Sequence, residues 1–150
     1  NKKTPQYLKE FSTFYQTWLM NKYIGGGIKN FRYYCHERPK LNKNSHFICN
    51  MHPHNYYLEI LTETGIIGFL LIFFSFLNVL YISFKKTFVG EKFSLDYLSL
   101  IPLKFLFLVE IFPIKSTGSF FTTGNASYLF FILPILVALC RKKHLSKNNS

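Results

Sequence analysis

The sequence contains few acidic residues, no internal repeat and no long low-complexity tract. Seven Asp and Glu oppose 18 Lys and Arg, and the resulting net charge of +11 points to an anionic partner. A nucleotide-binding loop is also missing, because the glycines at 25–27 are not followed by Gly-Lys-Ser/Thr. We therefore interpret this triplet as a flexible turn.

Charge is missing altogether from residues 65–84, GIIGFLLIFFSFLNVLYISF. A helix of this length, rising 1.5 Å per residue, reaches about 30 Å, the hydrocarbon thickness of a bilayer. We therefore expect a transmembrane helix here. Two weaker apolar stretches, 95–114 and 122–140, indicate further spans. Polar residues interrupt the first of these: Asp96, Pro102, Lys104 and Glu110. The sequence thus predicts an all-α polytopic membrane protein with about three transmembrane helices.

Basic residues are unevenly distributed among the short loops, which predicts the orientation of the spans. They follow the first and third spans at Lys85, Lys86, Lys92, Arg141, Lys142, Lys143 and Lys147. None lies at 116–125, between the second and third spans. We therefore expect 1–53 to form an extracytoplasmic, periplasmic loop region, 54–140 the membrane domain and 141–150 a cytoplasmic tail.

The region 1–53 should lie outside the cytoplasm although it carries nine Lys and Arg against two acids. Long translocated segments follow the positive-inside rule poorly. On that face of the membrane nucleic acid is a poor partner, and membrane lipids or another anionic ligand fit better. The chain starts with Asn-Lys-Lys, without an initiator Met or an apolar leader, so we expect a fragment preceded by earlier spans.

Residues 6–23 show apolar side chains at helical spacing. The stripe comprises Leu8, Phe11, Phe14, Tyr15, Trp18 and Leu19, opposite Lys9, Glu10 and Gln16. This pattern predicts an amphipathic helix. Because amphipathicity does not name the partner, the helix lies either along the outer membrane interface or on the core of its own domain.

Two histidines flank a proline in HPHN, directly before the first span. Pro53 suits the first position of a helix, so we expect a helix to begin there and to continue unbroken into the span. His54 would then stand about 16 Å above Gly65. The same helix face would carry Leu58, Leu61 and Gly68. Its two glycines would permit close helix packing in lipid.

Three interpretations of these histidines are open from the residues alone. Histidine titrates near neutral pH, so His54 can act as a general base toward a substrate hydroxyl. Alternatively, a zinc ion could bind His46, Cys49, His52 and His54, although their spacing matches no standard zinc module. In the third interpretation, both are polar interfacial residues without a chemical role.

The stretch HNYYLEILTETGIIG resembles the signature of the O-antigen ligase and polymerase family of bacterial membrane glycosyltransferases, which is His-Asn, nine residues, then Gly-x-x-Gly. The matching residues are His54, Asn55, Gly65 and Gly68. GGGIKNFRYYC followed by CNMHPHN is similar to the outer loop of many members, and FPIKSTGSFFTTGNASYLFF to their closing spans. Ligases often continue the motif with Thr-Arg, whereas Phe69 and Leu70 follow here, so the resemblance does not separate ligase from polymerase.

The resemblance implies transfer of a glycan from a polyprenyl-pyrophosphate carrier to an acceptor hydroxyl of a saccharide or lipid core, without metal or cofactor. It implies that His54 is the catalytic base, supported by His52 and Asn55, and that arginines hold the pyrophosphate. The candidates are Arg32 and Arg38, because the guanidinium fork pairs bidentately with phosphate. It also implies a multi-pass protein of the bacterial inner membrane whose site faces the periplasm. The competing hypothesis is a non-catalytic transporter or lipid-carrier-binding subunit.

Two of the three cysteines, Cys35 and Cys49, lie in the predicted outer segment, where an oxidising environment permits disulfides. We hypothesise that they pair. Closing such a loop would contribute about 3 kcal/mol in the chain-entropy model. The bond would hold Arg32 near His54, whereas Cys140, at the cytoplasmic end of the third span, should stay reduced.

Overall fold

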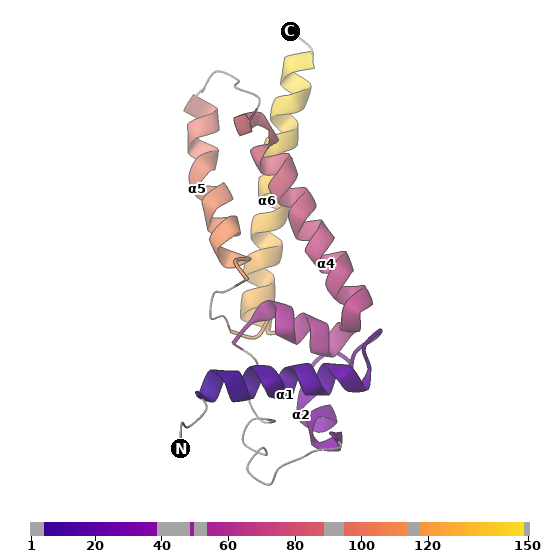
Figure 1. The fold of residues 1–150 in the computed structure, drawn as a ribbon. Coiled ribbons are helices and arrows are strands. Elements are labelled where there is room, and N and C mark those ends of the chain that lie inside the picture. The colour runs from indigo at the N-terminus through magenta and orange to yellow at the C-terminus, as the bar shows by residue number, and fades with distance from the viewer. Residues whose placement is uncertain (1–4, 39–48, 50–53, 89–94, 114–117, 149–150) are drawn as a thin grey trace. The chain divides into compact units, whose positions relative to one another are not determined.

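The computed structural model describes residues 5–38, 49, 54–88, 95–113 and 118–148, and the regular elements within them are helical (Figure 1). In chain order they are α1 (Gln6–Met20), α2 (Phe31–Tyr34), the 3₁₀ turn η1 (Cys35–Glu37), α4 (Tyr56–Phe88), α5 (Leu95–Glu110) and α6 (Thr123–Asn148). These described segments contain no strand, which confirms the all-α class predicted from the sequence.

The chain folds into two compact units, which we describe separately. The first comprises Asn1–Ile72 and Ser116–Asn125 and contains α1, α2, η1 and the first part of α4. The second comprises Phe73–Lys115 and Ala126–Ser150 and contains the rest of α4, α5 and most of α6. The assignment of regions to the two sides of a membrane stays a prediction.

Helix α4 is broken at Gly65, whose φ of 66° and ψ of −172° are not helical. Figure 1 shows that the short segment before this residue runs across the direction of the segment after it. The expectation of an unbroken helix from Pro53 into the span is therefore wrong, because the helix begins at Tyr56 and bends at Gly65.

A small core holds the first unit together. Phe14 of α1 stacks on Phe31 of α2 with ring centroids 3.8 Å apart. Both rings are buried together with Cys35 and Cys49, which are joined by a disulfide with Cα atoms 5.6 Å apart. The residues of the predicted apolar stripe of α1 therefore have two environments, because Phe14 packs in this core whereas Phe11 is exposed.

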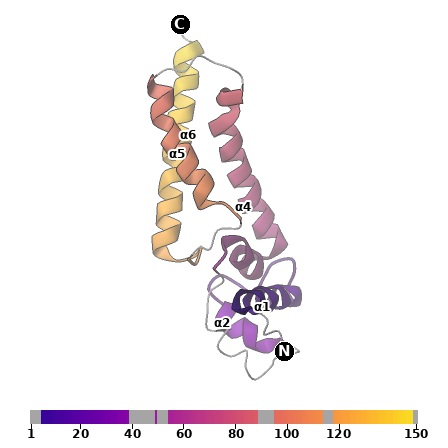
Figure 2. The same cartoon turned by 60° about the vertical axis from the view of Figure 1, so that its left-hand side comes forward.

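Helices α4 and α5, whose ribbons Figure 2 shows, are connected in the second unit by aromatic side chains. Phe76 meets Phe107, and Phe84 meets Phe105, each pair edge to face with centroids 6.0 Å apart. Lys104 is buried, and its Nζ lies 5.7 Å from the centroid of the Phe84 ring. This cation therefore faces a neighbouring helix, which spares it the high cost of contact with hydrocarbon.

One helix of the described chain is long and apolar enough to cross a membrane, namely α4 between Tyr56 and Lys85. Only 17% of its most apolar stretch is buried inside the structure, and Leu71 and Phe74 are exposed. The core helix of a water-soluble protein would be covered, so this exposure favours contact with lipid. Helix α5 has 16 residues and reaches about 24 Å, and the apolar part of α6 is Thr123–Leu139. The three-span count therefore stays a prediction.

Candidate functional site

The break at Gly65 separates four backbone groups that a regular helix would pair. In such a helix the N–H groups of Ile66 and Ile67 would donate to the carbonyls of Thr62 and Glu63, four residues earlier. The conformation of Gly65 prevents both bonds. Because an unpaired buried backbone group costs about as much as a lost hydrogen bond, the groups need other partners.

The turn that follows α1 supplies all four partners. The bonds run from Ile66 N–H to Lys22 O (2.8 Å), from Ile67 N–H to Tyr23 O (3.2 Å), from Gly26 N–H to Thr62 O (2.9 Å) and from Gly27 N–H to Glu63 O (2.9 Å). We call residues 22–27 and 62–67 together the glycine clamp. Its reciprocal bonds fix the bend of α4, so the bend is not a loose hinge.

Two glycines, Gly25 and Gly65, allow the clamp to close. Both have positive φ, 72° and 66°, which glycine adopts without steric cost. A Cβ on Gly25 would lie 2.5 Å from the carbonyl carbon of Glu63, and a Cβ on Gly65 would overlap the carbonyl of Tyr23. The glycine triplet lies in a turn, as the sequence indicated, but the backbone bonds of the clamp hold this turn, so it is not flexible. Gly65 serves the bend of α4.

Two buried carboxylates attach more distant segments to the first part of α4. The Oε2 atom of Glu63 accepts a hydrogen bond of 2.7 Å from the backbone N–H of Lys29. One turn earlier, Glu59 accepts hydrogen bonds from the hydroxyl of Ser119 and the backbone N–H of Phe120, shortly before α6. The side chains of Glu59 and Glu63 are only 3% and 5% exposed, so these hydrogen bonds are shielded from water. This shielding strengthens them.

The side chain of Asn55 caps the first part of α4. Its Oδ1 accepts hydrogen bonds from the backbone N–H groups of Tyr57 at 3.0 Å and Leu58 at 3.2 Å, the pattern of an N-cap. The helix consequently begins at Tyr56. His54 lies directly before the cap and not inside the first helical turn.

His54 is exposed at this helix start. Its predicted alignment with Gly65 and Gly68 along one helical face is wrong, because the histidine precedes the helix and the axis bends at Gly65. Gly68 lies after the bend, where an added Cβ would meet the side chain of Thr64. His52 is outside the described residues.

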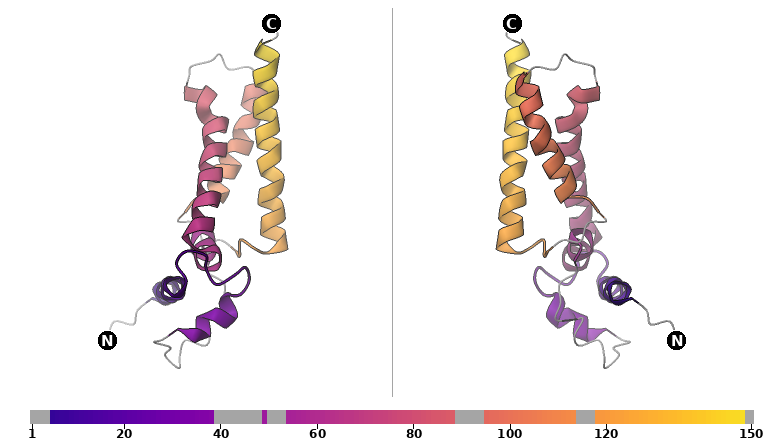
Figure 3. Two further views of the ribbon diagram at one scale, coloured as in Figure 1. Left: turned by 90° about the vertical axis from the view of Figure 1, so that its right-hand side faces the viewer. Right: turned by 90° about the vertical axis from the view of Figure 1, so that its left-hand side faces the viewer.

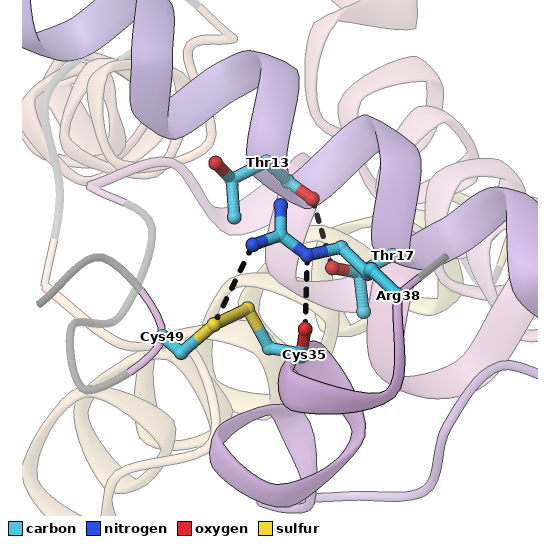
Figure 4. Close-up of a disulfide and its surroundings, with 5 residues drawn as sticks. All are labelled: Thr13, Thr17, Cys35, Arg38 and Cys49. Atoms are coloured by element: carbon cyan, nitrogen blue, oxygen red, sulfur yellow. Dashed lines mark hydrogen bonds between the residues drawn. A yellow bond between two sulfur atoms is a disulfide. The ribbon is translucent and has the colours of Figure 1, made fainter. Parts of the chain in front are cut away.

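Arg38 is buried between α1 and the disulfide (Figure 4). Its Nε donates to the carbonyl oxygen of Cys35 at 2.9 Å, and its Nη2 lies 3.7 Å from the Sγ of Cys49. Burial lowers the pKa of the Arg38 guanidinium from its ordinary value, although an arginine remains a cation at neutral pH. Cys49 is in the disulfide, so it has no thiolate to bind the zinc ion of the four-ligand interpretation.

Arg32 has the opposite environment, because it is exposed on α2. Its neighbour Phe31 is in the core, and Cys35 anchors the chain three residues later. The backbone that carries Arg32 is thus held on both sides while its guanidinium faces solvent. Arg32 and His54 belong to the same compact unit.

Sequence reasoning named His54, Asn55 and both cysteines as candidates but missed the contacts of Glu59 and Glu63. A signal was present, because two acids stand one turn apart at the start of an apolar helix, where an uncompensated charge is expensive. Such residues need partners, and here backbone N–H groups from other segments provide them.

The described residues define a class: a helical protein with one helix that fits a membrane span and with a His-Asn motif at the start of that bent helix. A family model described as O-antigen ligase matches residues 7–73. This part of the chain is therefore similar to the O-antigen ligase family, which confirms the resemblance seen in the sequence. The match runs from α1 through the glycine clamp to just beyond the bend. No curated protein and no solved structure shows a significant match to the chain.

This family indicates glycan transfer of the O-antigen ligase or polymerase type, from a lipid-linked donor to an acceptor. It also agrees with the membrane association that the apolar second part of α4 favours. The matched residues include His54, Asn55, Arg32 and Arg38, so the candidate residues named from the sequence for base and pyrophosphate lie inside the matched segment.

Proposed function

We propose that this protein transfers a glycan from a polyprenyl-pyrophosphate carrier to a sugar hydroxyl, with His54 as the general base. The observation that carries the proposal is the exposure of His54 directly before the Asn55 cap, within the segment that matches the family. The cap fixes the backbone next to the histidine, while the imidazole remains accessible to an acceptor.

The proposed step is a displacement at the anomeric carbon of the donor glycan. His54 takes the proton of the acceptor hydroxyl, and the acceptor oxygen forms a bond to the anomeric carbon. The bond between that carbon and the pyrophosphate oxygen breaks, and polyprenyl pyrophosphate leaves with the electron pair. The imidazolium then returns its proton to water, so the base is regenerated.

The leaving group gains negative charge as the bond breaks, and a nearby guanidinium stabilises that charge. Arg32 is our first choice for this contact, because it is exposed on a backbone held by Phe31 and the disulfide. Arg38 is the second choice, because its Nε and Nη2 already contact Cys35 and Cys49. We assign Arg38 mainly to the support of the segment that carries Arg32.

The location proposed for this chemistry is the periplasmic face of a bacterial inner membrane, with a multi-pass membrane domain behind it. The acceptor is either a growing saccharide or a lipid core, so the activity is polymerase or ligase. No metal or cofactor takes part in the proposed step, because the base, the nucleophile and the leaving group need none.

The test is glycan transfer in membrane vesicles that contain the protein and a polyprenyl-pyrophosphate-linked glycan. The His54→Ala variant should lower the rate by about 10²- to 10⁴-fold while carrier binding persists. The matched control is His36→Ala, which removes another histidine of the same unit, in η1, and should keep the rate. An unchanged rate in His54→Ala would refute the base assignment.

The competing hypothesis of a carrier-binding or transporter subunit predicts another outcome. In that case the wild-type protein binds the carrier but transfers no glycan with any donor and acceptor. Arg32→Ala distinguishes the arginine's role, because loss of a phosphate contact weakens carrier binding as well as transfer. Arg32→Lys keeps the charge but not the planar fork, so it should restore only part of the loss.

A further inference from the structure

Helix α1 presents three faces with different chemistry. One face is buried against its own unit and carries Glu10, Thr13, Phe14 and Thr17. A second, polar face is exposed and carries Lys9, Ser12 and Gln16. The third face is apolar and also exposed, with Tyr7, Leu8, Phe11, Tyr15 and Leu19 between 38% and 59% accessible. Because the core already occupies the first face, the apolar face needs a different partner.

The turn after α1 extends the exposed apolar surface. Tyr23, Ile24 and Ile28 are 61–70% accessible. The same turn is bonded to the start of the apolar segment of α4, because the carbonyl of Tyr23 accepts the N–H of Ile67. The clamp therefore places these exposed side chains beside the start of the uncharged stretch at 65–84.

The orientation of α1 within the first unit agrees with a position along a surface. Figure 3 shows α1 nearly end-on while the turns of α4 at 66–72, which belong to the same unit, run lengthwise, so α1 lies across the direction in which α4 leaves the bend. A helix crossing a membrane would instead run along that direction. An interfacial helix with one apolar and one polar face lies in the plane of the membrane.

The composition of this surface fits the boundary between headgroups and hydrocarbon. Tyr and Trp are enriched there, and the apolar face and the adjoining turn contain Tyr7, Tyr15 and Tyr23. Across residues 5–30, all described, the exposed charges are the cations Lys9, Lys22 and Lys29, whereas the acid Glu10 is buried. This charge attracts anionic lipid headgroups.

We propose that the apolar face of α1 and the turn at 23–28 lie in the outer interfacial layer of the bilayer that α4 enters. The partner is a lipid surface, and the contact is independent of the glycan-transfer chemistry. It would fix the height of the first unit, including the His54 segment, relative to the headgroups through the clamp.

The chain contains a single tryptophan, Trp18, which reports on this contact. Trp18 is half-buried on α1, with its Nε1 donating to the carbonyl of Lys22 at 3.0 Å. The protein is reconstituted into phosphatidylcholine vesicles whose lipids carry bromine either near the headgroup or near the chain end. Trp18→Phe provides the blank that isolates the Trp18 signal.

We expect stronger quenching of Trp18 fluorescence by the shallow bromines than by the deep ones, and weak quenching by aqueous iodide. Phe11→Glu, on the apolar face, should reduce quenching by lipid and increase quenching by iodide. Gln16→Glu, on the polar face, is the matched control and should change neither, because the same carboxylate then faces water.

Two results would overturn the proposal. Strong iodide quenching without lipid quenching would place the apolar face in water. Weak quenching by both reagents would mean that protein covers the face, from a second copy or from another part of a longer chain. Phe11 is exposed, so Phe11→Glu removes no core contact, and circular dichroism would verify that the variant is folded.

Discussion

The two units hold their helices by different means. Besides its small core, the first unit has many directional bonds: four backbone hydrogen bonds of the clamp, the hydrogen bonds of the Glu59 and Glu63 carboxyl groups, and one covalent disulfide. The described contacts of the second unit are mostly aromatic, such as Phe76 with Phe107. A hydrogen bond fixes distance and angle, whereas apolar contact accepts a range of arrangements.

The two units also differ in the function that we propose for them. The first unit carries His54 and most of the residues that match the O-antigen ligase family. The proposed chemistry is therefore located in the unit whose geometry is fixed by directional bonds. The second provides apolar surface, including exposed residues of α4 such as Phe74 and Tyr81. Substitutions in the clamp should therefore lower the free energy of unfolding more than substitutions in the aromatic contacts of the second unit.

The largest effect is expected at Gly65. In Gly65→Ala the residue keeps a positive φ that alanine rarely adopts, and its Cβ overlaps the carbonyl of Tyr23. We expect a loss of about 3 kcal/mol of unfolding free energy, measured by denaturant titration in detergent micelles. Gly124→Ala is the control, because an added Cβ there meets nothing within 4 Å. Equal stability of the two variants would refute the structural role of the bend.

Removal of the disulfide should have the next largest effect. The bond closes a loop between residues 14 apart, so Cys35→Ser with Cys49→Ser should cost about 3 kcal/mol in the chain-entropy model. Reduction of the wild-type protein should have the same result, with a fall in transfer because Arg38 loses its contact with the bridge. Cys140→Ser is the control. If thiol titration of protein purified without reductant finds all 3 cysteines free, the bond does not form.

Much of the helical framework could be predicted from local pattern. The uncharged run at 65–84 predicts the apolar part of α4, and the spacing of Phe11, Tyr15 and Leu19 predicts the exposed face of α1. The periodicity could not separate Phe14 from Phe11, since both are apolar on neighbouring faces. Which of them enters a core depends on α2, whose Phe31 stacks on Phe14.

The bend and its supports could not be predicted, because their causes are distant in the chain. From the sequence alone, Gly65 is compatible with a continuous membrane helix. The bend depends on the turn at 22–27, whose carbonyls accept the backbone N–H groups of Ile66 and Ile67. Glu63 is bonded to a residue 34 positions away, and Glu59 to one 61 positions away. Local spacing contains no information on such pairs. The His-Asn motif pointed to the candidate site, whereas the position of His54 relative to the helix required the structure.

A smaller effect is expected at Glu59. In Glu59→Ala the hydroxyl of Ser119 and the N–H of Phe120 lose their acceptor, which should cost about 1–3 kcal/mol. Hydrogen exchange of the Phe120 amide should become faster, and mass spectrometry of the segment would measure it. Glu59→Gln retains one acceptor oxygen and should restore part of the protection. Glu37→Ala, at an exposed acid, is the control. Unchanged exchange in Glu59→Ala would mean that the carboxylate does not hold this segment.

The smallest effect is expected in the second unit. Phe107→Leu keeps an apolar side chain but loses the edge-to-face contact with Phe76, so the free energy of unfolding should fall by about 1 kcal/mol. Phe131→Leu, at a position 69% exposed on α6, should change it less. The same denaturant titration compares both with Gly65→Ala. If Phe107→Leu lowers the free energy of unfolding as much as Gly65→Ala does, the aromatic contacts of the second unit are as important for its stability as the directional bonds are for the first. The proposed difference between the units would then be refuted.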